Sequence, residues 1–403
     1  MKNLKKISLT FFILSFILIN IEAITKTDIK IGKEIIEEYL EIYDDIGLKG
    51  EEIELPTTLK NDIKSYTQKK LYIIRKRMDN FNLNVDNYKH SYEYSKEEID
   101  KDSLIIEVKL TKEYKFRNLK EKTFEIINYK FTLIKLDGKY IISEITSDDI
   151  YDVSIKELNL TRSEKSNIDN FLEKEEELIK KEKEELKDIF EEESNSNLNE
   201  NNNKFNRSNQ NRNLKSLNRN KMKDYAGKHY DTPNPNYYDF TNIGGDCSNF
   251  TSQVIRAGGA PFDNVGNERW YYYSLNNRTP SWTSVEYLYK YLINNTGFGL
   301  EAIKSDIFNM EIGDVIQIDT NYDGTFNHSV IVVENDIDKV KDNFDLNNPQ
   351  ELEDSKKIQE FLDSYIIRGP FLLVAARTYN SYNRPLLTYP GEKRYIHLVG
   401  YNQ

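Results

Sequence analysis

The chain has 403 residues, a formal net charge of -11 and a pI near 5.2. This length exceeds what one hydrophobic core usually organises, so we expect two domains joined by a connecting segment. The acidic balance leaves no excess of Lys and Arg to neutralise phosphates, which excludes a general nucleic-acid binder.

The first 23 residues have the order of a secretory signal. Basic side chains among the first six residues precede an apolar run from Ile7 to Ile21, and the small residue Ala23 closes the segment. The run is short for a helix that spans a bilayer. We therefore expect residues 1–23 to be removed on export, giving a secreted or cell-surface protein, with retention as an anchor as the alternative.

Residues 24–160 are predicted to form an α+β domain. Apolar residues recur at helical spacing from Thr27 to Tyr43 and again from Leu59 to Met78. Alternating residues indicate strands over 104–110, 123–136 and 140–142, with Asp137-Gly138 as a tight turn. Helices followed by a curved antiparallel sheet resemble the NTF2-like and cystatin-like folds, and this likeness rests on element order alone.

Residues 161–220 are predicted to connect the two domains. From about Arg162 to Glu193, Glu and Lys dominate, with enough opposite-charge pairs to support an exposed helix that acts as a spacer. From Ser194 to Asn220 the chain is rich in Asn and Ser and has little apolar surface to bury. We expect a flexible linker there, and we place the domain boundary in it.

The stretch around Cys247, the single cysteine, carries the candidate chemistry. Gly244 and Gly245 break the chain before it, and apolar residues at helical spacing follow it. Cys247 is thus predicted to begin a helix, where free N–H groups and the helix dipole lower a thiol pKa from about 8.5. The same amides could bind an oxyanion. Asp246 and Ser248 are the predicted supporting residues, and we expect Asp246 to cap the helix.

A nucleophilic thiol needs a base, and the chain contains 4 histidines. His90 lies in the predicted N-terminal domain, and His229 lies in the polar segment before the cysteine. His328 follows Gly313-Asp314 and a polar turn and opens an apolar strand, from which it can reach a helix N-terminus. His397 alternates with apolar residues on a terminal strand, and we interpret it as structural.

These blocks resemble an amidase domain family of Gram-positive bacteria that is related to the NlpC-like and CHAP-like cysteine peptidases with a papain-like core. The resemblance covers residues 221–403 and rests on residues 244–250, 313–315 and 327–332. Several ordered motifs that coincide are more specific than any single pair of Cys and His. The fold class implied is α+β with a papain-like C-terminal domain.

The resemblance implies that Cys247 is the nucleophile and His328 the base, acting on an amide carbonyl through an acyl-enzyme. The family commonly has His followed by Thr after the next strand, whereas this chain has Arg377-Thr378. Arg377 cannot accept the imidazole N–H. Asn380 can, through its amide oxygen, and is the predicted third catalytic residue. The departure could instead mean weakened or lost activity.

Aromatic residues near the cysteine stretch are candidates for a substrate groove. Trp270, Trp282 and Tyr238 are predicted to line it, with core or rim packing as the alternative. Residues 336–363 are predicted to be an acidic, helix-like insertion that packs outside the core, with a role in shaping the substrate groove as the alternative.

The segment from Asp319 to Gly324 resembles the start of a calcium loop. Val330, however, stands where an EF-hand has its bidentate Glu, and we favour a polar hairpin turn. No metal or other cofactor is therefore predicted.

The sequence thus predicts a secreted cysteine amidase or peptidase. Peptidoglycan is the expected substrate because it is the abundant amide polymer outside the membrane, which gives either an N-acetylmuramoyl-L-alanine amidase or an endopeptidase. One alternative is a cell-surface binding module of the same fold without turnover. Another is acyl transfer to an amine by the same Cys–His pair. The sequence predicts neither the bond that is cut nor the oligomeric state.

Overall fold

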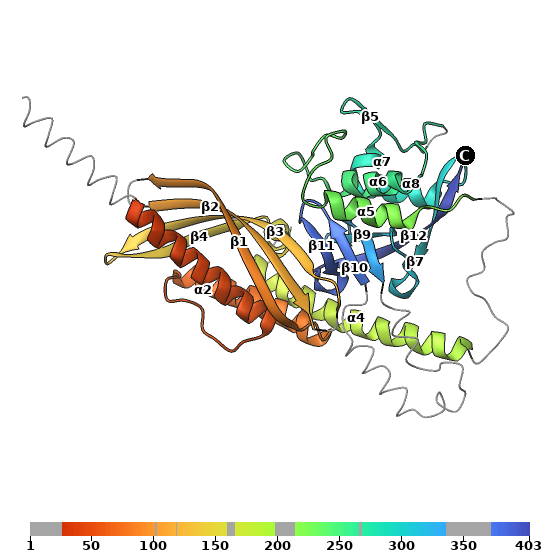
Figure 1. The fold of residues 1–403 in the computed structure, drawn as a ribbon. Coiled ribbons are helices and arrows are strands. Elements are labelled where there is room, and N and C mark those ends of the chain that lie inside the picture. Colours follow the sequence, from red (N-terminus) through yellow and green to blue (C-terminus); the bar gives the residue numbers. More distant parts are fainter. Residues whose placement is uncertain are drawn as a thin grey trace, which may run out of the picture. The chain divides into compact units, whose positions relative to one another are not determined.

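The computed structural model describes residues 26–100, 103–117, 119–158, 166–197, 214–265, 268–335 and 372–403 (Figure 1). The chain divides into two compact units. Unit 1 comprises residues up to 71, 91–110 and 128–147, and unit 2 comprises 72–90, 111–127 and 148–403. The predicted signal segment, most of the predicted linker and the predicted acidic insertion lie outside the described residues. No described helix is both long enough and apolar enough to cross a membrane.

Unit 1 combines helices with an antiparallel sheet. Residues 26–44 are helical and lead into a π-helical turn. The strand order is β1-β2-β3, with β4 paired to β3. The elements are η1 (Asp45–Lys49), α2 (Asn61–Asn80), β1 (Val85–Asp100), β2 (Ser103–Phe116), β3 (Thr123–Leu136) and β4 (Lys139–Ser147). Helix α2 and strands β1 to β3 contribute residues to both units.

Packing in unit 1 follows the predicted alternation. Alternate residues of β2 are buried, and the ring of Tyr39 in the first helix meets Phe131 of β3 edge-on at 5.9 Å. Asp137 and Gly138 have φ angles of 51° and 79°, which confirms the predicted tight turn. Strand β1 was not predicted because most of its side chains are exposed and give no apolar pattern.

Unit 2 contains an antiparallel sheet with the order β3-β11-β10-β9-β8-β12-β7, in which Glu125 of β3 pairs with Ser381. Its strands are β7 (Gly299–Ser305), β8 (Val315–Asp319), β9 (His328–Asn335), β10 (Leu372–Ala376), β11 (Ser381–Pro385) and β12 (Glu392–Asn402). A separate hairpin joins β5 (Tyr272–Ser274) and β6 (Asn277–Arg278). The fold is therefore α+β, as the sequence predicted.

Helices α5 and α6 contact β9 and β10, α8 contacts β7, and α7 packs on α6 and α8 (Figure 1). Helix α6 buries Phe250, Val254 and Ile255. The helices of unit 2 are α3 (Ile150–Glu157), α4 (Asn167–Asn197), α5 (Arg219–His229), α6 (Cys247–Ala257), α7 (Pro280–Thr283) and α8 (Val285–Asn294), and the short turns are η2 (Ile307–Asn309) and η3 (Leu386–Thr388). This packing places the start of α6 beside β9.

Helix α4 corrects the prediction of an exposed spacer. It buries the apolar residues Phe171, Leu178 and Ile179, and the ring of Phe171 meets that of Tyr322 at 6.1 Å. Glu175, on the same helix, is fully buried. The prediction was wrong because the many Glu and Lys residues concealed a narrow apolar face, and α4 belongs to the same compact unit as the cysteine.

Candidate active site

Cys247 is the first residue of α6 and is buried, which confirms its predicted place at a helix N-terminus. Gly244 and Gly245 precede it with φ angles of 81° and 95°, a conformation that glycine adopts without strain. A Cβ atom on Gly245 would lie 3.2 Å from Oγ1 of Thr378. The two glycines thus let the chain turn sharply and pass close to the neighbouring loop just before the thiol.

The carboxylate of Asp246 organises the loop that precedes Cys247. Its Oδ1 accepts hydrogen bonds from the Phe240 N–H at 2.9 Å and from the Asn249 side chain at 2.8 Å. Its Oδ2 lies 3.2 Å from Nε of Arg377. Asp246 occupies the N-cap position, but its side chain makes no capping bond, so the predicted capping role was wrong. The carboxylate bonds to the loop backbone and to the Asn249 side chain of α6, but it accepts from no backbone N–H of the helix.

Arg377, which departs from the resembled family, clamps that loop. Its guanidinium is buried and pairs with Asp246 and, at 3.3 Å, with Asp239. The next residue, Thr378, has a φ of 83°, which is rare for a β-branched residue. Its hydroxyl accepts the Asp246 N–H at 2.6 Å. Arg377 and Thr378 therefore position the backbone that delivers the thiol.

His328, the first residue of β9, is 2 % exposed. Its ring lies edge-on to Tyr379 at 4.8 Å and stacks on Tyr389 at 6.2 Å. Within the described parts of the chain, its Nε2 atom has no hydrogen-bond partner. Burial lowers the pKa of His328 to about 3, and the Arg384 guanidinium shifts the pKa in the same direction. The imidazole is therefore neutral at physiological pH.

The thiol lies against the strand that His328 begins. Burial raises the pKa of the Cys247 thiol, while hydrogen bonds from the Ser329 backbone and from Ser248 act in the opposite direction. The hydroxyls of Ser248 and Ser329 are 3.3 Å apart, which joins α6 to β9 directly. The sequence predicted a lowered thiol pKa. Here burial outweighs the hydrogen bonds at the helix start, so the free thiol is held in its neutral form.

Asn380, the predicted third catalytic residue, is engaged elsewhere. Its Oδ1 accepts the Thr378 N–H at 3.1 Å, and its carbonyl oxygen accepts the Ile126 N–H at 2.9 Å. The rings beside His328 are instead those of Tyr379 and Tyr389, which sequence reasoning missed. Tyr379 adjoins Asn380 in the sequence, but nothing in the sequence pattern distinguishes these two tyrosines among the 28 in the chain.

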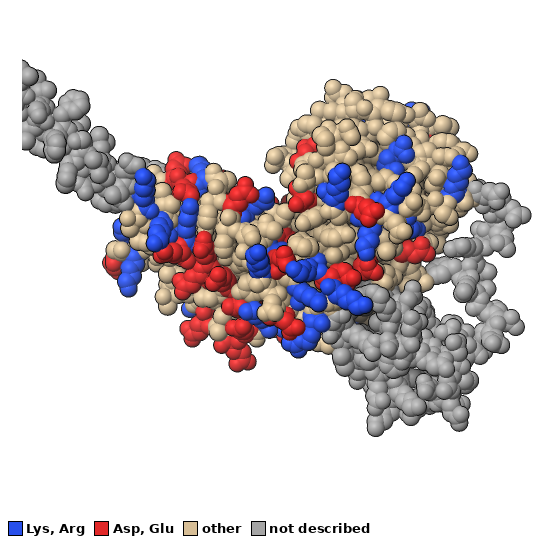
Figure 2. Space-filling model, viewed as in Figure 1, with Lys and Arg blue, Asp and Glu red and all other residues tan. Residues whose placement is uncertain are grey.

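The two tryptophans that were predicted to line a substrate groove lie in the core, so that prediction was wrong for both. Trp270 and Trp282 are fully buried, and their ring N–H groups donate to Ser252 at 3.0 Å and to Asn249 at 2.8 Å. They pack behind α6 because each indole finds both apolar neighbours and a polar partner there. Tyr238 is 39 % exposed and remains a candidate for substrate contact. Side chains over the part of unit 2 that carries α7 and β5 are mostly uncharged (Figure 2).

His397 is a buried residue of β12 whose Nδ1 lies 2.7 Å from Oδ2 of Asp314. The other oxygen of Asp314 pairs with Arg219 of α5 at 2.7 Å. This arrangement supports the structural interpretation of His397. It also gives the Gly313-Asp314 motif a role, since Asp314 links α5 to β12.

The polar loop after β8 closes on itself. Oδ2 of Asp319 accepts the Gly324 N–H at 2.8 Å, and Oδ1 of Asp323 accepts the Thr325 N–H at 2.8 Å. Over the described ranges, no three or more His, Cys, Asp or Glu side chains gather in a way that could hold a metal ion. The loop has the hairpin form that we favoured.

The C-terminal part of the chain is similar to known protein sequences. Residues 216–399 match the family described as "Putative amidase domain". The uncharacterized protein YhbB of Bacillus subtilis (strain 168) is 35% identical over 144 residues, which are 35% of this chain and 43% of YhbB. The uncharacterized protein YjcM of the same organism is 29% identical over 115 residues, 27% of this chain and 25% of YjcM. The chain thus spans less than half the length of either relative. No solved structure matches. The family match indicates amide hydrolysis as the class of reaction.

Proposed function

We propose that unit 2 is a cysteine-dependent amidase with Cys247 as nucleophile and His328 as general base. One observation carries the proposal: the thiol at the start of α6 lies against the backbone of Ser329, the residue that follows His328. Both residues lie within the region that matches the amidase family. A buried thiol against the strand that a buried imidazole begins, together with the free N–H groups of the helix, supplies the groups that acyl transfer needs.

The pKa directions define the first chemical step. The pKa of Cys247 is raised and that of His328 is lowered, so the free site holds a thiol and a neutral imidazole. As the thiol attacks the amide carbonyl, its proton passes to His328 and the oxyanion faces the first N–H groups of α6. His328 then protonates the leaving amine. Water, activated by the same imidazole, hydrolyses the thioester and restores the thiol.

The proposed site is similar to the NlpC-like and CHAP-like sites in placing the cysteine at a helix start and the histidine at a strand start. Those folds have a papain-like core, and we extend that comparison to unit 2. The orientation of the imidazole differs from the sequence prediction. We assign it to packing between Tyr379 and Tyr389 and not to Asn380, whose side-chain oxygen accepts the Thr378 N–H.

Peptidoglycan is the substrate that we propose. The signal-like order of residues 1–23 supports export, and peptidoglycan is the amide polymer that an exported protein meets. A binding module without turnover is the second candidate. It is favoured by one observation, that Arg377 stands where the resembled family commonly has His and serves as a loop clamp.

The test is digestion of purified peptidoglycan by the full chain and by Cys247→Ala and Cys247→Ser. Mass spectrometry of the released fragments identifies new amine or carboxyl termini and thereby the bond that is cut. We expect new termini with the wild type only. If all three proteins bind the cell wall and none releases fragments, the hydrolase proposal is wrong and the binding module stands. Conjugates that form with an added amine would instead show acyl transfer.

A further inference from the structure

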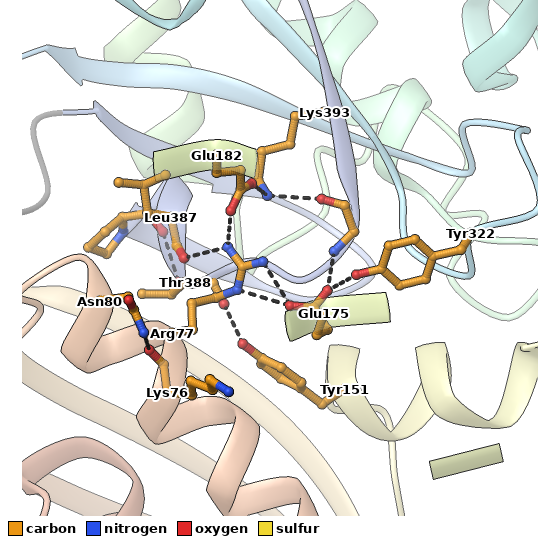
Figure 3. A network of polar contacts seen from close by, with 12 residues as sticks. Lys76, Arg77, Asn80, Tyr151, Glu175, Glu182, Tyr322, Leu387, Thr388 and Lys393 are labelled. Carbon is orange, nitrogen blue, oxygen red and sulfur yellow. Dashed lines mark hydrogen bonds and ion pairs between the residues drawn. The ribbon is translucent and has the colours of Figure 1, made fainter. Parts of the chain in front are cut away.

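A buried cluster of four charged residues lies in unit 2, partly outside the region that matches the amidase family. Arg77 of α2 is 0 % exposed, and its Nη2 lies 2.7 Å from Oε2 of Glu175. Its Nη1 lies 2.7 Å from Oε2 of Glu182, whose other oxygen lies 2.5 Å from Nζ of Lys393 (Figure 3). Both glutamates belong to α4. Arg77, Glu175 and Glu182 all precede the matched residues 216–399.

The charges in this cluster balance, with two cations facing two anions. Burial by itself would raise the pKa of Glu182, but the charges of Arg77 and Lys393 lower it, so the carboxylate is ionised. Buried ion pairs contribute little net stability because desolvation offsets attraction, but removing one partner is costly. A cluster of this kind fixes the geometry of the backbone around it more than it adds stability, and the groups that it contacts are therefore informative.

The cluster reaches the segment that carries Tyr389. Arg77 Nη1 donates to the Leu387 carbonyl at 3.1 Å, and Oε1 of Glu175 accepts the Gly391 N–H at 2.8 Å. Nearby, the Tyr151 hydroxyl donates to the Thr388 carbonyl at 2.9 Å (Figure 3). Residues 387–391 are thus held at three points on either side of Tyr389, whose ring stacks on His328.

The cluster also reaches the loop that leads into His328. The hydroxyl of Tyr322 donates to Oε1 of Glu175, the oxygen that also accepts the Gly391 N–H (Figure 3). The ring of Tyr322 also packs against α4, where it meets Phe171 edge-on at 6.1 Å. One carboxylate oxygen therefore joins the loop before His328 to the segment that contains its stacking partner.

We propose that Arg77 is a positioning residue for the Cys247–His328 site. By orienting Glu175 and the Leu387 carbonyl, it sets the Tyr389 ring and the His328 loop in the arrangement that keeps the imidazole buried beside the thiol. The inference rests on the proposed function, because the pair that is positioned is the proposed catalytic pair. It follows that residues 216–399 do not suffice for the reaction and that α2 and α4 complete the site.

The shape of the arginine side chain is part of the argument. The planar guanidinium donates at once to two carboxylates and one carbonyl, in directions fixed by its geometry. A lysine at position 77 would keep the charge but offer a single ammonium group on a flexible stem. Arg77→Lys therefore keeps the positive charge but loses the planar arrangement of donors. Arg77→Met loses both the charge and the donors.

The same helix provides a matched control. Lys76 also pairs with α4, at 2.5 Å from Glu176, but both side chains are partly exposed. Lys76→Met removes a contact between the same two helices without touching residues 387–391 or Tyr322. Tyr322→Phe is a second, milder probe, since it removes only the hydroxyl bond to Glu175 and keeps the ring that packs on α4.

The experiment compares these full-length variants by the pH titration of the His328 ring in NMR spectra, with thermal unfolding as the measure of folding. Assignment uses His328→Gln. The groups that face the imidazole are the rings of Tyr379 and Tyr389 and the guanidinium of Arg384, and the Cys247 thiol acts electrostatically on Tyr379. We expect Arg77→Lys and Tyr322→Phe to remain folded. In both variants the pKa of His328 should rise towards its ordinary value by about one unit or more. Lys76→Met should leave it unchanged.

Peptidoglycan hydrolysis provides the second readout. We expect kcat to fall by about tenfold or more in Arg77→Lys, with KM little changed, because the imidazole is misplaced and the substrate surface is not. If the Arg77 variants unfold at lower temperature but keep the wild-type titration and kcat while folded, Arg77 is only structural and the inference is wrong. The NMR titration needs no substrate and therefore tests the role of Arg77 by itself. A failure of the hydrolase proposal is recognised separately, if Cys247→Ala behaves as the wild type in peptidoglycan digestion.

Discussion

The two halves of the candidate site are held in different ways. The loop that delivers Cys247 is fixed by Asp246, Arg377 and Thr378, all within the region that matches the amidase family. The surroundings of His328 are instead fixed through Tyr389 and by a buried charge cluster that includes Arg77. The proposed nucleophile is thus positioned by residues of the matched region, and the proposed base by Tyr389 together with helices that precede that region.

This difference separates two kinds of defect. Damage on the cysteine side should disturb the loop and the thiol while leaving the imidazole buried. Damage on the histidine side should change the titration of the imidazole while leaving the loop before Cys247 in place. Because Cys247 is the single cysteine, labelling by iodoacetamide reports on one thiol, and the His328 titration reports on the other half independently.

Arg377→Met should have the largest effect on stability. It leaves the carboxylate of Asp246, which is 1 % exposed, without its ion-pair partner, at a cost of about 3 kcal/mol. Asp239 is more exposed and contributes little. Urea unfolding measures the loss, and Arg377→Met/Asp246→Asn should recover part of it. A raised pKa of His328 in the folded Arg377→Met protein would show that the cysteine side and the histidine side are not held independently.

The pH dependence of stability should come next when its size is taken per pH unit. A histidine whose pKa falls from its ordinary 6.5 to about 3 binds fewer protons folded than unfolded between those values. Its contribution is therefore fully present above pH 6.5 and is lost as the pH falls towards 3, by about 1 kcal/mol per pH unit. Urea unfolding at several pH values measures the slope. His328→Gln should flatten it, and an equal slope in that variant would assign the effect to other groups.

The local structure around Cys247 could largely be predicted from the sequence, because its signals are local. Gly244 and Gly245 mark a turn, apolar residues at helical spacing mark α6, and both signals are local. Strand β3 was predicted with its observed bounds because alternation and the Asp137-Gly138 turn agree. The family resemblance then connected Cys247 to His328, which lies 81 residues further along the chain.

The surroundings of His328 could not be predicted from the sequence. Glu175 and Glu182 lie in a run of charges that in most proteins faces solvent, so their burial has no local signature. Arg77 follows Arg75 and Lys76, and the sequence does not distinguish the buried cation from its partly exposed neighbours. The stacking of Tyr389 on His328 depends on how η3 and β12 follow β11, which only the folded chain determines.

The smallest effect that we predict distinguishes the two glycines before the thiol. Gly244→Ala and Gly245→Ala both force a positive φ on an alanine, at a cost of about 1 kcal/mol each. A Cβ on Gly244 meets nothing within 4 Å, whereas one on Gly245 lies 3.2 Å from the Thr378 hydroxyl oxygen that accepts the Asp246 N–H. Gly245→Ala should therefore lose more stability in urea than Gly244→Ala, and it alone should change the rate of Cys247 labelling. Equal labelling rates in the two variants would mean that the contact with Thr378 does not position the thiol, and the cysteine side would then depend on Arg377 and Asp246 alone.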